Sequence, residues 1–320
     1  MLSVWNWLLP EWAQPNHPLL QYELAQTRGK GGRIGLKLQL VLLSLLIGGS
    51  ALLYAAATRN PQSAANLTGV FWRSVYYPAL VLQVITLIMA FALGAAAVGG
   101  ERSRKTWDHL RVTEFGAGVA LRARWAGILY RLRAPILLIL LIRLILVGGI
   151  VYDLTAFGGL YPAMLGAQAT PPLPWRLDLL LIALAVLVNM LLPLAAIATV
   201  AALGILISVA VKERVYAAII QILVVLAQLT ASLAGALAIA QTIARDASGA
   251  DDWSYALFFG YSAFGDLGLL LAQLGSLGEV WNRVPNGATI IVCLMVILVA
   301  LGAAADGMMW LAGGLSESRG

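Results

Sequence analysis

The sequence predicts an all-α polytopic membrane protein with six transmembrane helices. Apolar residues make up 61% of the 320-residue chain and charged residues only 11%, whereas an ordinary globular domain is about 25% charged. The apolar residues gather in runs of about 20 to 30, which suit helices crossing a ~30 Å hydrocarbon core and are too long for barrel strands. Lys and Arg concentrate in alternate connections between these runs. A helix satisfies its backbone groups internally, as a lipid environment requires.

The six predicted spans form a single transmembrane domain covering residues 1–320. They are Leu36–Ala57, Tyr76–Val98, Leu132–Tyr152, Leu179–Val211, Val215–Ala244 and Ala288–Ala312. The fourth span is too long for one straight crossing, and Pro193 is expected to kink it. The polar sequence from Lys212 to Arg214 predicts a tight turn between the fourth and fifth spans.

The distribution of basic residues predicts the orientation. Fifteen of the 21 Lys and Arg residues fall in segments on one side, five fall on the other side, and Arg143 lies within a span. Because cytoplasmic segments carry the excess of Lys and Arg, both termini are expected in the cytoplasm. The protein is therefore predicted to be a multi-pass protein of the cell (inner) membrane.

The cytoplasmic segments are residues 1–35, predicted to contain an N-terminal interfacial helix, and the insert 99–132 between the second and third spans. The second half of the insert spaces five apolar residues along one helical face and predicts a helix that lies along the inner surface. They are Leu121, Trp125, Ile128, Leu129 and Leu132. The first half carries Trp107 and Leu110 as a short apolar ridge, which could dock in a groove on a cytoplasmic partner. Alternatively, the basic insert binds anionic membrane lipids and fixes the topology, at about 1 kcal/mol per basic residue.

On the opposite side, the segment 245–287 is rich in aromatic and leucine residues that would be costly to expose to water. It predicts re-entrant or interfacial helices before the sixth span, broken at Gly260, Gly265 and Gly268.

Several classes of chemistry find no support in the sequence. One cysteine, Cys293, and two histidines, His17 and His109, exclude a disulfide framework and a Cys or His metal cluster. A P-loop needs a glycine immediately before its lysine, yet Arg104 precedes Lys105, and a membrane helix leads into this segment. The expectation is a chain with no catalytic residue, metal or cofactor of its own, no enzyme activity and no nucleic-acid partner.

Arg143 is the one basic residue deep in a predicted span, where a charge costs at least about 2.5–3.5 kcal/mol unless it faces the interior. One interpretation places it on a translocation path with Asn189 and Gln221. The other gives it structural hydrogen bonds to carbonyl groups or to polar side chains of other spans.

The order of these elements resembles the membrane subunit of type-2 ABC transporters. In that family an N-P-(I/L)-L-x-x-E-L interfacial helix comes first, and the stretch NHPLLQYEL matches it with His17 inserted. Its coupling segment, E-x-x-x-G-T-x-(E/D)-x-L, resembles the sequence that begins at Glu101, and LGILISVAVKERVYA is similar to the small-residue pattern that ends its fourth span.

The resemblance implies a permease subunit that pairs with a second copy or a paralogue and docks on ATP-binding cassette subunits, which bind and hydrolyse the ATP. The implied interfacial-helix residues are Pro18, Leu20, Glu23 and Leu24. The implied coupling-helix residues are Glu101, Arg102, Thr106, Trp107, Asp108 and Leu110. An amphipathic or lipid-like cargo is expected. Lys105 and Glu114 replace the Gly and Pro usual in the family, and they motivate a competing hypothesis: a non-transporting accessory or scaffold subunit of a larger membrane complex.

Overall fold

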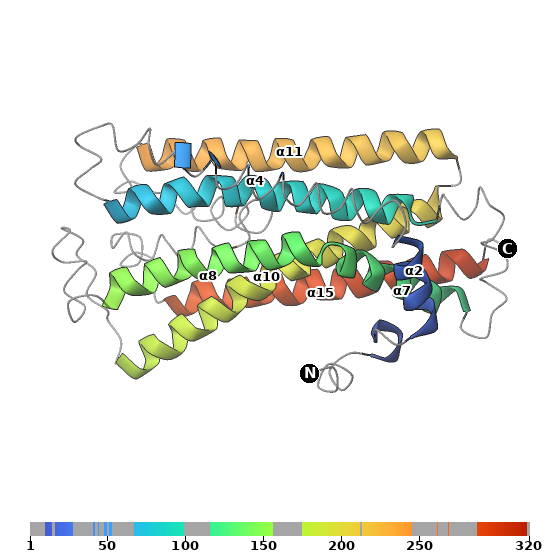
Figure 1. Ribbon diagram of the computed structural model, residues 1–320, viewed down its shortest axis with the longest axis horizontal. Helices are drawn as coiled ribbons and strands as arrows, with labels where there is room; N and C mark the ends of the chain where they lie inside the picture. The colour runs from blue at the N-terminus through green and yellow to red at the C-terminus, as the bar shows by residue number, and fades with distance from the viewer. Residues whose placement is uncertain are drawn as a thin grey trace.

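The computed structural model describes residues 10–14, 17–27, 67–98, 116–155, 175–211, 213–244 and 287–318, with residues 41, 44, 48, 49, 51, 52, 261 and 268. Within these residues the chain is helical and contains no strand. The elements are η1 (Glu11–Ala13), α2 (Pro18–Thr27), α4 (Leu67–Ala96), α7 (Gly116–Arg131), α8 (Arg133–Thr155), α10 (Trp175–Ala210), α11 (Arg214–Ala244) and α15 (Gly287–Ser318). The long helices α4, α8, α10, α11 and α15 lie lengthwise in one bundle, with the short α2 set across one end (Figure 1).

Four of the described helices contain a stretch long and apolar enough to cross a membrane. The stretches are Ser74–Ala96, Val186–Ala210, Val215–Gly235 and Ile291–Glu317. A fifth crossing results if α7 and α8, which meet at a 56° bend, form one broken span. These helices correspond to the second to sixth predicted spans. Most of the first predicted span lies outside the described residues, although Val41 and Leu52 are helical.

The helix boundaries differ from the predicted ones at several places. α4 begins at Leu67, nine residues before the predicted span, and α15 continues six residues beyond Ala312 to Ser318. Pro193 lies inside α10, which continues through it as one helix. The predicted tight turn agrees with the structure, since α10 ends at Ala210 and α11 begins at Arg214.

The central helix is α10, which packs against α4, α8, α11 and α15 and against the shorter α7. Its inward face contributes fully buried residues to the core: Leu192, Ile197, Ala201, Ala202, Ile205 and Val209. The outer helix α11, by contrast, leaves Val215, Leu223 and Leu233 more than half exposed. Such an outer surface suits lipid, which is as apolar as the side chains themselves.

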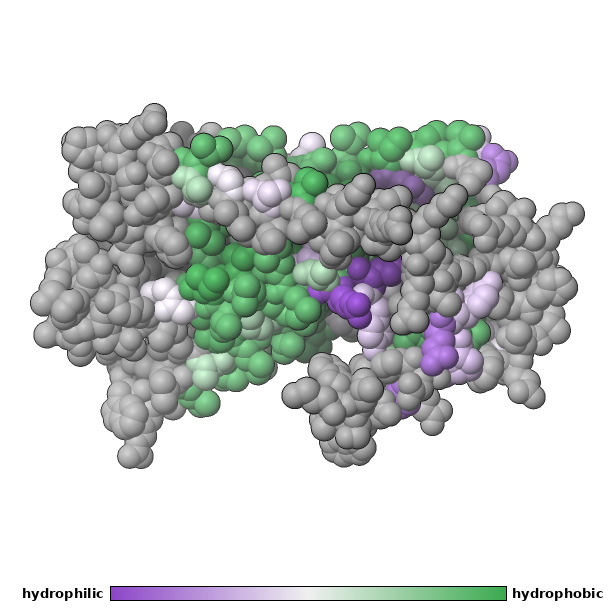
Figure 2. Space-filling view, in the orientation of Figure 1, coloured by the Kyte–Doolittle hydropathy of each residue, from purple (hydrophilic) through white to green (hydrophobic). Residues whose placement is uncertain are grey.

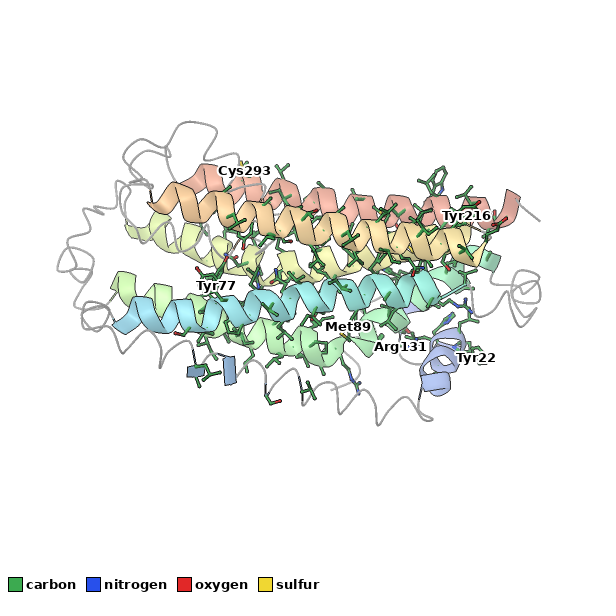
Figure 3. All side chains as sticks on the ribbon, turned by 90° about the horizontal axis from the view of Figure 1, so that it is seen from above. Tyr22, Tyr77, Met89, Arg131, Tyr216 and Cys293 are labelled. Carbon is green, nitrogen blue, oxygen red and sulfur yellow. The ribbon has the colours of Figure 1, made fainter. Side chains whose placement is uncertain are left out.

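One end of the bundle, here called the α7 end, collects α2, α7 and the last turns of α15 (Figure 1). Tyr22, Arg131 and Tyr216 lie toward this end, and Tyr77 and Cys293 lie toward the other (Figure 3). Apolar side chains cover the middle of the visible face, and the hydrophilic ones gather toward the α7 end (Figure 2).

Candidate functional site

A buried polar cluster joins three of the long helices in the interior of the bundle. Arg143 of α8 is 2% exposed and donates a 2.8 Å hydrogen bond from Nη2 to Oε1 of Gln83 on α4. Its Nη1 donates a 3.0 Å bond to the backbone carbonyl oxygen of Asn189 on α10. Arg143 lies ten residues after the start of α8, about 15 Å along the helix. The guanidinium thus faces the interior, as a charge at that depth requires.

The carbonyl of Asn189 lacks its usual donor within α10. In a regular helix the carbonyl of Asn189 would accept from the backbone N–H of residue 193, four positions later. Position 193 is a proline, which has no N–H to donate. The guanidinium of Arg143 supplies a donor in its place, so α10 continues through Pro193 with this carbonyl hydrogen-bonded.

The side chain of Asn189 borders a residue from the segment before the last span. Gly268 has a φ of +92°, and a Cβ built on it would lie 3.3 Å from Asn189 Oδ1 and 3.2 Å from Leu294 Cδ2. A larger residue at position 268 would have a strained backbone because of the positive φ, and its Cβ would press against Asn189 and Leu294. Tyr261, 6% exposed, packs against Gly235 of α11. Residues 261 and 268 therefore both lie against the bundle.

A second group of contacts lies at the α7 end, where α7 is bonded to α4 and α10. Nη1 of Arg124 donates a 2.8 Å bond to the carbonyl oxygen of Ala97, just beyond the end of α4. Nε1 of Trp125 donates a 2.8 Å bond to the carbonyl oxygen of Ala198 on α10. The Arg124 bond joins the two sides of residues 99–115, the first half of the predicted insert, because α4 ends before this stretch and α7 begins after it.

The residues just beyond the end of α4 are also held by α10. The backbone N–H of Val98 donates a 3.1 Å bond to Oγ of Ser208. The carbonyls at a helix C-terminus lack intrahelical hydrogen-bond donors and carry partial negative charge. The guanidinium of Arg124 supplies a donor to one of them and places a positive charge beside them. At the other end of residues 99–115, Gly116 begins α7 with a φ of +69°, a conformation that glycine adopts readily.

The N-terminal helix packs on α7. Leu20 of α2 is fully buried and forms a small apolar cluster with Ala13 of η1 and Ala126 of α7. The rings of Trp12 and Trp125 have centroids 5.9 Å apart. η1, α2 and α7 thus form one unit, here called the α7 platform.

The predicted interfacial residues have mixed outcomes. The predicted helix forms as α2, where Leu20 is buried and Pro18 is exposed at the first helical position, a favourable place for proline. Glu23 and Leu24 belong to α2, but their side chains lie outside the described residues. The six coupling residues Glu101, Arg102, Thr106, Trp107, Asp108 and Leu110 also lie outside the described residues.

Of the predicted path residues, the structure brings Arg143 and Asn189 together but not Gln221. Gln221 is half-buried on the outer helix α11 and takes no part in the described hydrogen bonds around Arg143. Gln83 joins the cluster instead. Its sequence signal is that it is one of the few polar residues within the predicted spans.

Two further charged residues, one basic and one acidic, have contacts that were not predicted. Arg124 lies outside the predicted apolar face of its helix, yet it is only 4% exposed because it caps α4. Asp306 lies within the sixth predicted span and pairs with Arg122 of α7, Nη2 to Oδ1, at 3.2 Å. An acidic residue within an otherwise apolar span indicates that a basic partner lies nearby, and this signal could have predicted the pair.

The chemistry of the buried cluster is that of a fixed positive charge surrounded by neutral amide oxygens. Among side chains whose burial is described, no carboxylate is buried. The described residues also contain no group of three or more His, Cys, Asp or Glu side chains placed to share a metal ion. The cluster can hold helices together or contact an anionic group. Comparisons of the chain with family models, curated proteins and solved structures give no match.

Proposed function

We propose that the chain is the membrane-spanning permease subunit of an ATP-driven exporter of the type-2 ABC kind. It would move an amphipathic or lipid-like substrate across the cell membrane while a separate ATP-binding cassette subunit hydrolyses ATP. The observation that carries the proposal is the bonding of α7 to α4 and α10 on the two sides of residues 99–115. A partner that displaces residues 99–115 would move α7, and α7 continues directly into α8.

The contacts beyond α7 supply a physical route from the insert to the interior. α7 joins α8 through the 56° bend at Leu132, which is itself 1% exposed. Ten residues into α8, Arg143 contacts both α4 and α10. A tilt of α7 is therefore expected to change the packing of these helices around Arg143.

The proposed subunit has the span count and orientation that the sequence predicts. It has six spans, with both termini in the cytoplasm and the α7 end facing the cytoplasm. Residues 245–287 form a re-entrant segment before the last span, which is supported by the contacts of Tyr261 with Gly235 and of Gly268 with Asn189. A second copy or a paralogue completes the lateral path.

The experiment is a mild-detergent purification of the tagged chain with its natural partners. The proposal expects a P-loop ATPase to co-purify, and it expects the double substitution Trp107→Ala/Leu110→Ala to remove that ATPase without lowering the amount of folded chain. Trp253→Ala is the matched control, because it removes the same type of side chain from the segment expected on the opposite side of the membrane. An ATPase that stays bound to the double variant refutes the docking role of the insert.

The second candidate is a non-transporting scaffold subunit, and the rigidity of the core favours it. Gly94 of α4 and Gly204 of α10 allow backbone contact between the two helices, and Arg143 bonds α4, α8 and α10 together. Such close bonding suits a part that holds others in place. Recovery of the chain within a large complex that lacks any ATPase would favour this function over transport.

A further inference from the structure

An ion pair lies on the outer surface of α15, away from the buried cluster. Nη2 of Arg122 on α7 lies 3.2 Å from Oδ1 of Asp306, and their side chains are 37% and 76% exposed. The two residues are 184 positions apart in the sequence. This pair joins α7 to the last helix while leaving most of the carboxylate accessible.

The surroundings of the pair on α15 are apolar and exposed. Asp306 belongs to the stretch Ile291–Glu317, which is apolar enough to cross a membrane. On the same helix Val299 is 68% exposed and Trp310 is 71% exposed. A charged pair on such a surface is costly unless polar groups of the membrane reach it.

Trp310 indicates how deep the pair lies. Tryptophan favours the membrane–water interface, where its ring meets the headgroups. Asp306 precedes Trp310 by four residues, about 6 Å along the helix and on the same face. Arg122 approaches from α7 with a long, flexible side chain that can extend toward the interface. The polar groups available at this level are water and phospholipid headgroups.

The charges of the site select among headgroups. A guanidinium has five N–H donors, so Arg122 can bond a phosphate while it keeps its bond to Asp306. The exposed carboxylate of Asp306 can accept from a primary ammonium, and the nearby ring of Trp310 favours a cation in the same place. A headgroup that joins a phosphate to a primary ammonium presents both charges together.

We propose that Arg122, Asp306 and Trp310 form a binding site for the headgroup of an aminophospholipid of the phosphatidylethanolamine type, taken from the surrounding leaflet. The phosphate contacts Arg122, and the ammonium contacts Asp306 and Trp310. Phosphatidylcholine has no N–H to donate to the carboxylate. Phosphatidylglycerol brings a net negative charge close to Asp306 with no ammonium to offset it. This site does not depend on the transport function.

The test is native mass spectrometry of the purified full chain with phosphatidylethanolamine, phosphatidylcholine and phosphatidylglycerol of identical acyl chains, added one at a time. The expected result is about ten-fold tighter retention of phosphatidylethanolamine than of the other two, the size of one charge-assisted contact. Asp306→Asn should remove the preference over phosphatidylcholine, and Asp306→Glu should keep it. Arg122→Gln should weaken the binding of both zwitterionic lipids. Glu317→Gln, which neutralises another exposed acid of α15, should change nothing.

Four outcomes overturn the proposal. They are equal retention of the three lipids by the unmodified chain, preference for phosphatidylglycerol, an unchanged preference in Asp306→Asn, and a stable dimer cross-linked through a cysteine placed at Val299. The last result would show that a second copy covers this face instead of lipid. The lipid comparison on the unmodified chain decides the matter even if a variant does not fold.

Discussion

Gly94 of α4 and Gly204 of α10 face each other where the two helices cross. A Cβ built on Gly204 would lie 2.5 Å from the carbonyl oxygen of Phe91 and 2.9 Å from the backbone nitrogen of Ala95. A Cβ on Gly94 would meet the carbonyl oxygen of Ala201. Because the obstructing atoms are backbone atoms, neither helix can yield by a change of side-chain rotamer. Small residues at such crossings let membrane helices approach closely.

The first prediction is that Gly204→Ala separates α4 from α10 and destabilises the protein. The inserted methyl group overpacks the crossing at a cost of about 1–3 kcal/mol, more than the helix propensity gained from alanine. The thermal unfolding temperature in detergent should therefore fall by several degrees. Gly302→Ala is the matched control, because a Cβ there meets nothing within 4 Å. Equal unfolding temperatures for the two variants would contradict the crossing described here.

The second prediction concerns Arg124 as a cap for α4. Arg124→Gln removes the donor that satisfies the carbonyl oxygen of Ala97, and a lost bond from a charged group costs about 1.5–3 kcal/mol. The expected result is faster hydrogen–deuterium exchange in the last turn of α4 and a lower unfolding temperature. The exposed Arg133 provides the control, since Arg133→Gln removes the same charge from the start of α8. Unchanged exchange in Arg124→Gln would show that Ser208 alone holds this turn.

The general architecture was predictable from the sequence because the bilayer imposes it. Apolar runs long enough to span a membrane specify helices, and the tight turn at Lys212 to Arg214 fixes one connection. The apolar face of the insert was also predictable, since Leu121 and Ile128 are both buried as their spacing implies. These features depend on local periodicity alone.

Pairings between distant residues were not predictable in the same way. The sequence indicates that Arg143 needs a hydrogen-bond partner, but it does not distinguish among several Gln and Asn residues in other spans that could accept from it. The choice of Gln83 depends on the rotation of α4 about its axis, which the packing around Gly94 and Gly204 determines. The charge of Arg124 by itself favours exposure, whereas the backbone just after α4 presents a buried carbonyl to which Arg124 donates. Tertiary contacts decided both cases.

The third prediction is that Pro193 and Arg143 are energetically coupled. Arg143→Met leaves the carbonyl of Asn189 without the donor that replaces the missing N–H of Pro193, at a cost of about 1–3 kcal/mol. In a Pro193→Ala background, alanine supplies that N–H, so the same substitution should cost about 1 kcal/mol less. The four proteins of this double-mutant cycle can be compared by unfolding in detergent.

A parallel cycle with Pro78→Ala provides the control for that coupling. Pro78 lies inside α4, and an N–H at position 78 would serve the carbonyl of Ser74 instead. The effects of Pro78→Ala and Arg143→Met are therefore expected to add. Additivity in both cycles would mean that Arg143 does not stand in for the helical bond at Pro193.

The fourth prediction is that the insert and the segment before the last span face opposite sides of the membrane. With Cys293 replaced by serine, single cysteines at Ser103 and Ser248 can be probed with a reagent that does not cross the bilayer. In intact cells, Ser248→Cys should react and Ser103→Cys should react only after the membrane is opened. The reason is the excess of Lys and Arg on the side of the insert, which resists translocation. The predicted topology places three crossings between the two positions. Reaction of both cysteines from the outside, or of neither, would mean an even number of crossings between them and would contradict that topology. A reversed pattern would turn the α7 end outward. In the last case the insert could not meet a cytoplasmic ATPase, and the proposed coupling would fail with it.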